Sequence, residues 1–280
     1  MNILTFDIED WYCHDNYSQN FDWDKHEVRI YEPMEKILSC LDEKKVKGTF
    51  FCLGWLVLHH PRIIKDIVNC GHQIGCHSFQ HQLAYRYDRA SFYSDTYKAK
   101  SLIEDLIGQP ITAYRAPSYS ITSSNLYAFD VLSELGFLFD CSVFPKSREC
   151  GGFSEYGQAI PGIIKHNGYS IKEFPMNVYR LLGRDIVFSG GGYFRIAPYP
   201  FIQMMVRNSN YIVSYFHPSD FDSGQPSMRH LPVMRQLKNK VCLKNNFEKF
   251  ERYIADNEFV NIEQADMLID WSKVKMVALN

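Results

Sequence analysis

The stretch Asn2-Ile3-Leu4-Thr5-Phe6-Asp7-Ile8-Glu9-Asp10-Trp11 opens the chain with an apolar run and ends in three carboxylates within four positions. Residues 2–6 have the composition of a strand. In barrels and open α/β sheets, functional side chains gather where the strands end on the carboxyl side. Three crowded carboxylates repel one another unless a cation or a shared proton relieves them. The stretch therefore predicts a first strand that delivers acidic groups to a site, although an acidic surface turn would have the same composition.

Short β-rich runs alternate with helix-like runs along the rest of the chain. We expect further strands at residues 48–53, 73–76, 112–114, 137–139, 170–174, 211–216 and 259–261. Amphipathic helices are expected at residues 32–45, 61–69, 90–107 and 123–135. Several helix ends are marked, by Pro61 at a first turn, by Gly71 and Gly136 at closures, and by Ser123-Ser124 as a cap. This alternation predicts an α/β fold, a parallel sheet or barrel with helices outside.

The alternation weakens between residues 145 and 200, where Gly151-Gly152, Pro161-Gly162 and Gly190-Gly191-Gly192 interrupt aromatic and β-branched residues. We interpret this part as an insertion or loop system that covers the barrel mouth. A chain of 280 residues has room for two small domains, but barrels commonly use this length as one. We therefore predict one domain over residues 1–280.

Composition and charge exclude several classes of protein. The formal net charge is −2 and 46% of the residues are hydrophobic, which argues against a nucleic-acid binder and for a globular chain with a sizeable core. The N-terminus runs straight into carboxylates instead of forming a leader, and the apolar stretch 50–58 is too short to span a bilayer. The eight cysteines include no C-x-x-C pair and are expected to be buried thiols. We expect a cytoplasmic protein with no transmembrane segment and no nucleic-acid partner.

A histidine pair follows the third expected strand, in His77-Ser78-Phe79-Gln80-His81. On a helical turn this spacing would place both imidazoles on one face, within reach of one zinc ion. With ten histidines in the chain, chance could also produce such a pair. Its position after a strand favours a metal site.

Polar residues also follow three later strands, at Arg115, Asp140 and His217. Arg115, between an apolar strand and Pro117, is difficult to bury unless it meets a carboxylate. His217 alone would be a common kind of core histidine. Together the strand ends deliver acid, a histidine pair, arginine, acid and histidine, the set of groups that a metal-assisted hydrolase uses.

The order of these motifs resembles the NodB-like polysaccharide deacetylases, carbohydrate esterase family four. The strongest local matches are Thr5-Phe6-Asp7, residues 77–81, Arg115-Ala116-Pro117 and Tyr215-Phe216-His217-Pro218. Residues 7–11, with Gly190-Gly191-Gly192-Tyr193-Phe194-Arg195, are similar to a branch associated with exopolysaccharide and surface-glycan gene clusters. The resemblance implies a deformed (β/α) barrel, a divalent metal that is usually zinc, and removal of an N-acetyl group from an amino sugar.

The resemblance implies that His77 and His81 are metal ligands, with a carboxylate of the first strand end as the third. The family has two adjacent aspartates where this chain has Ile8 between its carboxylates, so either Glu9 or Asp10 could be that ligand. Strand alternation favours Glu9, because it places Asp7 and Glu9 on the same face. A turn at Asp10 would favour Asp10 instead.

The same resemblance gives roles to the acid and base. Asp7 matches the general base, and His217 matches the general acid that protonates the leaving amine. Arg115 would keep Asp7 ionised. The motif after Arg115 departs from the family, so the backbone N–H that binds the oxyanion could belong to Ser118 or to Tyr119.

The family's carboxylate that orients the acid histidine has no clear counterpart. Asp140 and Glu173 are both candidates, and Ser118, Tyr119 and Glu173 are the residues expected to contact substrate. The expected partner is an N-acetylated carbohydrate, linked to a nucleotide, a lipid or an oligosaccharide, and the sequence leaves the oligomeric state open. Three alternatives are a hydrolase of another C–N amide bond, of the allantoinase kind, a carbohydrate-binding protein with a decayed site, and a two-carboxylate glycosidase.

Overall fold

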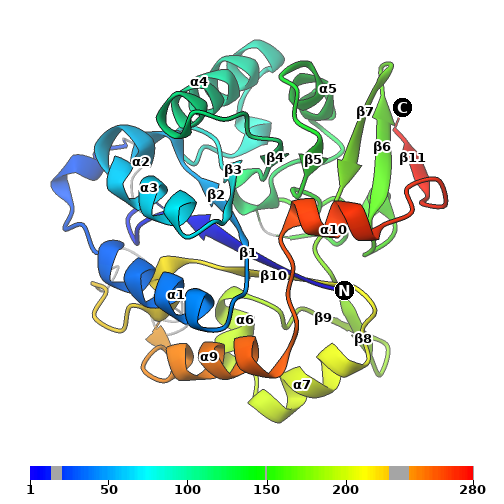
Figure 1. Ribbon diagram of the computed structural model, residues 1–280. Helices are drawn as coiled ribbons and strands as arrows, with labels where there is room; N and C mark the ends of the chain where they lie inside the picture. The colour runs from blue at the N-terminus through cyan, green and yellow to red at the C-terminus, as the bar shows by residue number, and fades with distance from the viewer. Residues whose placement is uncertain (14–20, 149, 227–239, 280) are drawn as a thin grey trace.

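The computed structural model describes residues 1–13, 21–148, 150–226 and 240–279 (Figure 1). The strands in these residues are β1 (Asn2–Ile8), β2 (Thr49–Cys52), β3 (Gln73–Cys76), β4 (Ala113–Tyr114), β5 (Phe139–Asp140), β6 (Gly162–His166), β7 (Tyr169–Glu173), β8 (Tyr179–Leu181), β9 (Arg184–Ile186), β10 (Ile212–Phe216) and β11 (Met276–Ala278). The main sheet has nine strands in the order β10-β1-β2-β3-β4-β5-β7-β6-β11. All its pairs are parallel except β6 with β7.

Helices surround this sheet in Figure 1. The α-helices are α1 (Tyr31–Glu43), α2 (Gly54–His59), α3 (Pro61–Asn69), α4 (Arg89–Ile107), α5 (Tyr127–Glu134), α6 (Gly191–Ile196), α7 (Tyr199–Arg207), α9 (Asn246–Asp256) and α10 (Ile262–Leu268). Short 3-10 turns are η1 (Trp23–Lys25), η2 (Ala84–Arg86), η3 (Pro117–Tyr119), η4 (Ser154–Tyr156) and η5 (Pro218–Phe221). Within the described part of the chain, none of these helices has both the length and the apolar character needed to cross a bilayer.

β1 lies inside the sheet, between β10 and β2, and residues 3–8 are buried. A strand covered on both faces has a nearly continuous apolar sequence, which explains the run Ile3-Leu4-Thr5-Phe6. Its alternate residues face two different cores. Leu4 and Phe6 pack with the surrounding helices, whereas Ile3 packs inside the curved sheet. Asp7, which is also odd-numbered, therefore lies on the inner side.

The inner core is narrow. It includes Phe51 of β2 and Val213 of β10, and Gly75 of β3 approaches it closely. A Cβ at Gly75 would lie 2.6 Å from the Phe51 ring, so only glycine fits beside this aromatic side chain.

The strands do not close into a complete ring in the described residues, because β10 and β11 are the edges of the sheet. The segment after β7 connects the chain that follows β5 with β10. The backbone N–H of Met176 donates to the Val143 carbonyl at 2.8 Å, and the Asn177 side-chain oxygen accepts from the Val213 N–H at 2.9 Å. The predicted α/β fold is confirmed, in the form of an open, barrel-like sheet with helices outside.

Some local expectations need correction. α5 begins at Tyr127 without a side-chain cap, so Ser123-Ser124 do not cap it. Instead, the Asn125 side-chain oxygen accepts from the Thr122 N–H at 2.8 Å and closes a turn ahead of the helix. Residues 259–261 form only a single bridge, from Val260 to Ile3. Residues 145–200 supply β6 and β7 to the main sheet, and their role as a covering insertion within one domain stays a prediction.

Candidate active site

The ends of β1 and β3 bring three of the expected ligands together. Glu9 follows β1, and His77 and His81 follow β3. One ligand atom from each residue lies within 4.8 Å of the other two, and all three side chains are buried. Oε2 of Glu9 is 2.9 Å from Nε2 of His81. We call these three residues the ligand cluster.

The two histidines reach one another through a loop and not through a helical turn. Residues 77–83 have no helical structure, and Ser78 and His81 have φ values of 67° and 57°. The His81 N–H donates to Oγ of Ser78 at 3.0 Å, and the two imidazole centroids are 5.2 Å apart. The expectation of a helical turn is therefore wrong. Left-handed backbone at non-glycine residues is costly and tends to occur at functional sites.

Asp10 lies outside the ligand cluster. Its carboxylate accepts backbone N–H groups from Trp11 at 2.7 Å, Arg29 at 2.8 Å and Ile30 at 3.1 Å. Burial raises its pKa to about 6, although these hydrogen bonds act in the opposite direction. Asp10 therefore fastens residues 29–30 to the end of β1. The turn that would have brought Asp10 toward the two histidines does not occur, and the carboxylate in the ligand cluster is that of Glu9.

The ligand cluster fits a divalent cation. Nδ1 of His77 lies 2.8 Å from the Arg115 carbonyl, which fixes the proton on Nδ1 and leaves Nε2 with its lone pair. Burial lowers the pKa of His77 to about 4, so the imidazole is neutral, as ligation requires. Two imidazoles and one carboxylate form one of the three-ligand sets that hold catalytic zinc and leave a position open.

Asp7 and Arg115 form a buried ion pair beside the ligand cluster. Nη1 of Arg115 donates to Oδ1 of Asp7 at 2.8 Å and to Oγ1 of Thr5 at 2.9 Å. Burial alone would raise the pKa of Asp7, but Arg115 and the imidazoles of His77 and His217 outweigh it and hold the pKa below its ordinary value. Asp7 is therefore an ionised carboxylate that can accept a proton.

His217 follows β10 and faces Asp7 and Glu9. Its Nε2 is 3.4 Å from Oε1 of Glu9 and 3.8 Å from Oδ2 of Asp7. Its side chain is 18% exposed, against 5% for Asp7 and 1% for Glu9. Burial would lower the pKa of His217, but the hydrogen bond that it donates to Asp220 and the charges of Glu9 and Asp7 raise it to about 9. His217 is therefore protonated at neutral pH, at the more open side of the site.

Asp220 orients His217, and sequence reasoning missed it. Oδ2 of Asp220 lies 3.2 Å from Nδ1 of His217 and accepts the His217 backbone N–H at 2.9 Å. The two residues form a capping box at the start of η5. A side chain three positions after an N-cap residue can reach back to that residue's backbone N–H, so the carboxylate three positions after His217 in His217-Pro218-Ser219-Asp220 contained a usable signal.

Asp140 and Glu173, the two predicted candidates for that role, bond elsewhere. They are register partners on β5 and β7 and are fully buried, and burial raises the pKa of both carboxyls, that of Glu173 well above its ordinary value. Oδ1 of Asp140 accepts from Oγ of Ser142 at 2.5 Å, and that hydroxyl accepts the Ala116 N–H at 2.8 Å. The pair therefore supports the loop after β4. Glu173 has no exposed surface, so its expected contact with substrate is wrong.

Residues Ser118 and Tyr119 lie in η3 of that loop, with φ values of 53° and 55°. The Tyr119 N–H donates to the Ala116 carbonyl at 3.1 Å, and the Tyr119 hydroxyl lies 3.6 Å from Sδ of Met176 in the inner core. The backbone N–H of Tyr119 is therefore engaged within the turn, while Ser118 is partly exposed.

Two family models match successive parts of the chain. Residues 4–138 match the family described as polysaccharide deacetylase. Residues 4–138 are a polysaccharide deacetylase domain. Residues 141–266 match a second family, described as a domain of unknown function, DUF3473. Asp7, Glu9, the two ligand histidines and Arg115 lie in the deacetylase match, whereas His217 and Asp220 lie in the second.

Curated relatives of the deacetylase domain match over part of their length. The peptidoglycan-N-acetylglucosamine deacetylase PgdA of Listeria monocytogenes is 32% identical over 81 residues, 29% of this chain and 17% of that protein. A peptidoglycan-N-acetylglucosamine deacetylase of Bacillus cereus is 26% identical over 102 residues, 36% of this chain and 46% of that protein. The chitooligosaccharide deacetylase of a Bradyrhizobium strain is 24% identical over 140 residues, 48% of this chain and 64% of that protein.

Solved structures extend the likeness of fold beyond the deacetylase domain. A Mycobacterium smegmatis protein assigned to the polysaccharide deacetylases has a TM-score of 0.67 at 20% identity, covering 100% of this chain and 93% of that one. A Bacillus anthracis pseudoenzyme of carbohydrate esterase family four has a TM-score of 0.51 at 14% identity, covering 99% of this chain and 66% of that one. The shared fold therefore includes the DUF3473 match.

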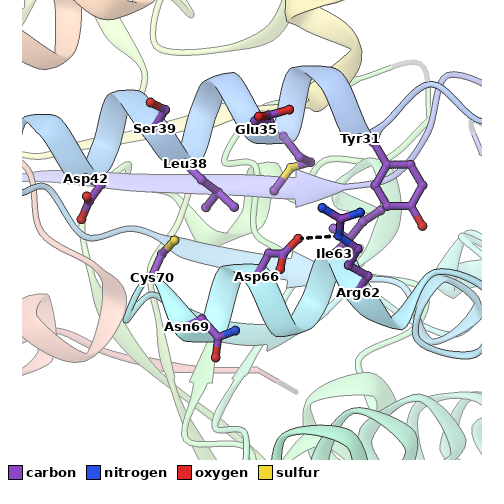
Figure 2. A pocket seen from close by; sticks show the side chains of 11 residues that line it. Tyr31, Glu35, Leu38, Ser39, Asp42, Arg62, Ile63, Asp66, Asn69 and Cys70 are labelled. Carbon is purple, nitrogen blue, oxygen red and sulfur yellow. Dashed lines mark ion pairs between the residues drawn. The ribbon is translucent and has the colours of Figure 1, made fainter.

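A separate cavity lies outside the sheet of the deacetylase domain, between α1 and α3 (Figure 2). It measures about 510 Å³. Its lining includes Tyr31, Leu38, Asp42, Ile63 and Asp66. None of its lining residues belongs to the ligand cluster, and neither Asp7 nor His217 lines it.

Proposed function

We propose that the protein is a divalent-metal-dependent hydrolase that removes the N-acetyl group from N-acetylglucosamine units of a polysaccharide or of its precursor. The observation that carries the proposal is the placement of Asp7 and His217 beside the ligand cluster. One is an ionised carboxylate and the other a protonated imidazole, 3.8 Å apart. Hydrolysis of an amide needs such a base and such an acid at one point.

Glu9, His77 and His81 would hold the cation. When bound there, it supplies a Lewis acid for the acetyl carbonyl and increases the acidity of water at the site. The protein's own groups carry the protons. Asp7 accepts a proton from the water whose oxygen bonds to the carbonyl carbon, and Arg115 keeps Asp7 ionised beforehand.

The second half of the reaction breaks the bond between the carbonyl carbon and the sugar nitrogen. His217 donates its Nε2 proton to that nitrogen, so the products are acetate and a free amino sugar. The backbone N–H of Ser118 is our candidate donor to the carbonyl oxygen, because the Tyr119 N–H is engaged by Ala116.

The substrate class rests on the relatives. The Listeria and Bacillus proteins bear names that specify N-acetylglucosamine in peptidoglycan, and the Bradyrhizobium protein's name specifies chitooligosaccharides. We extend the shared sugar to this chain. A role in exopolysaccharide or surface-glycan synthesis, zinc as the metal and a cytoplasmic location remain predictions from the sequence.

Release of acetate tests the proposal. The zinc-loaded protein should release acetate from chitooligosaccharides, from peptidoglycan fragments or from nucleotide-linked N-acetylglucosamine, and mass spectrometry should record the loss of one acetyl group per event. Ring opening of a cyclic ureide without acetate release would instead favour the allantoinase-like alternative. Binding of sugar without turnover at saturating metal would favour a decayed site.

A further inference from the structure

We infer that Arg195 is a positioning residue for His217, acting through Asp220, and that the DUF3473 match supplies the acid side of this active site. This inference rests on the proposed function, because it takes His217 as the acid that protonates the leaving amine. Arg195 ends the sequence Gly190-Gly191-Gly192-Tyr193-Phe194-Arg195, which the deacetylase match does not include.

The two oxygens of Asp220 have different partners. Oδ2 contacts both the backbone N–H and Nδ1 of His217, at 2.9 and 3.2 Å. Oδ1 lies 3.5 Å from Nη1 of Arg195. Asp220 is 5% exposed and Arg195 is 8% exposed. A guanidinium and a carboxylate buried to this degree are costly unless they meet one another, so this pair restrains the carboxylate from its far side.

The direction of the His217 ring depends on that carboxylate. With Nδ1 held by Asp220, Nε2 points toward Glu9 and Asp7, where the leaving nitrogen would be. Rotation of the ring would move the acidic proton away from this point. An anchored Asp220 therefore fixes the orientation of the acid before substrate arrives, which is how supporting residues contribute to catalysis.

Arg195 is itself held by helices of the DUF3473 match. Nζ of Lys249, on α9, donates to the carbonyls of Phe194 at 3.2 Å, Arg195 at 2.7 Å and Ala197 at 3.1 Å. A lysine at the C-terminal carbonyls of a short helix satisfies groups that would otherwise lack donors. α9 thereby fixes the end of α6 that carries the arginine.

The same helix also holds Asp220. Nδ2 of Asn246 donates to the Asp220 carbonyl at 2.9 Å, so α9 fastens both α6 and η5. At its other end α6 begins against β10, where a Cβ at Gly190 would lie 2.1 Å from the Tyr215 carbonyl oxygen. Glycine at position 190 therefore allows α6 to start beside β10, the strand that His217 follows. The glycine motif, which places α6 beside β10, and Arg195, which contacts Asp220, therefore both help to hold His217 in place.

The test compares two substrates that differ in their leaving group. Hydrolysis of an N-acetyl amide needs protonation of the amine, whereas 4-nitrophenyl acetate releases a stable phenolate without an acid. Arg195→Met keeps an unbranched apolar side chain like the arginine stem and removes the guanidinium, and Arg195→Lys restores a charge. Arg252→Met, at an exposed arginine on α9, is the matched control.

We expect Arg195→Met to lower kcat on a chitooligosaccharide about 10- to 100-fold, part of the ~10²–10⁴-fold that a placed acid contributes. Its KM should stay within about twofold, and its rate on 4-nitrophenyl acetate should change less than about threefold. Arg195→Lys should recover part of the loss, and Arg252→Met should match the wild type. Equal losses on both substrates, or no loss on the amide, would overturn the inference.

A second readout does not depend on turnover. In ¹⁵N-histidine NMR spectra of the metal-free protein, the His217 signals are identified by their absence from the His217→Ala variant. Arg195→Met should shift them and Arg252→Met should not, and unchanged signals would contradict the coupling. If the wild type releases no acetate while the shift is present, the proposed function fails and the Arg195–Asp220–His217 support stands as a structural device only.

Discussion

Oε2 of Glu9 lies 2.9 Å from Nε2 of His81, although the two residues follow different strands. The contact places a carboxylate from the end of β1 against an imidazole from the loop after β3. Glu9 and the adjacent Asp10 therefore have different partners, because the Asp10 carboxylate accepts three backbone N–H groups.

Substitutions at these two neighbours should therefore have opposite consequences. Glu9→Gln should weaken zinc affinity more than the ~10–100-fold that loss of an outer partner costs, because it removes a charged ligand. Asp10→Asn should keep the metal and lower the melting temperature, since asparagine replaces one of the accepting oxygens by a donor. Titration with zinc and thermal unfolding measure the two effects. Metal loss in Asp10→Asn with metal retained in Glu9→Gln would reverse our assignment.

Truncation of Arg115 should reduce the rate more than the metal content. Arg115 holds Asp7 ionised through a 2.8 Å hydrogen bond, whereas the atom that contacts His77 of the ligand cluster is its carbonyl oxygen, which Arg115→Met retains. The variant should lose activity on the amide at every pH. Its free energy of unfolding should fall by about 3–5 kcal/mol, because a buried carboxylate loses its partner. Arg115→Lys should be less destabilised. Full activity in Arg115→Met with ordinary stability would refute this role for the ion pair.

Glu173→Gln should stabilise the protein increasingly as the pH rises. The pKa of Glu173 is raised well above its ordinary value by burial and by Asp140. The folded state therefore keeps a proton that the unfolded state releases above its own pKa, and stability falls with rising pH. Glutamine can accept the Val143 N–H in the same place and never ionises. Melting temperatures from pH 5 to 9 should diverge in favour of the variant, and parallel curves would show that the pair titrates normally.

His72 should make the opposite contribution at acidic pH. Burial lowers its pKa to about 4, against ~6.5 in the unfolded chain. Between these values the unfolded state binds the extra proton, so stability decreases as the pH falls, by up to about 3 kcal/mol from this group. His72→Asn should remove that part of the slope. Urea unfolding of both proteins at pH 4.5 and 7 gives the comparison, and an unchanged slope in the variant would mean that His72 protonates freely in the fold.

The strand ends were predictable because each strand is short, apolar and followed at once by a polar residue. β3 and α3 lie at the residues predicted from periodicity and from Pro61 at the first turn. Strand alternation also favoured Glu9 over Asp10, since it gave Glu9 the inward side of β1. These features depend on local sequence, which a single chain displays directly.

Other parts of the site depend on contacts that local sequence does not display. The histidine spacing suggested a helical turn, but a loop in which Ser78 and His81 have positive φ brings the imidazoles of His77 and His81 together instead. Asp140 and Glu173 looked available because each lies near the end of an expected strand, yet β5 and β7 are neighbours and the two residues are register partners, buried away from His217. Asp220 was missed because its role comes from a capping box three residues beyond His217.

The most direct test of the account is acetate release from a chitooligosaccharide by chelated protein, before and after zinc is restored, in the wild type and in Asp7→Asn. We predict no release from the chelated wild type, recovery with zinc, and no recovery in Asp7→Asn even though that variant binds zinc as the wild type does. Release that survives chelation, or a zinc-loaded Asp7→Asn as active as the wild type, would contradict the account.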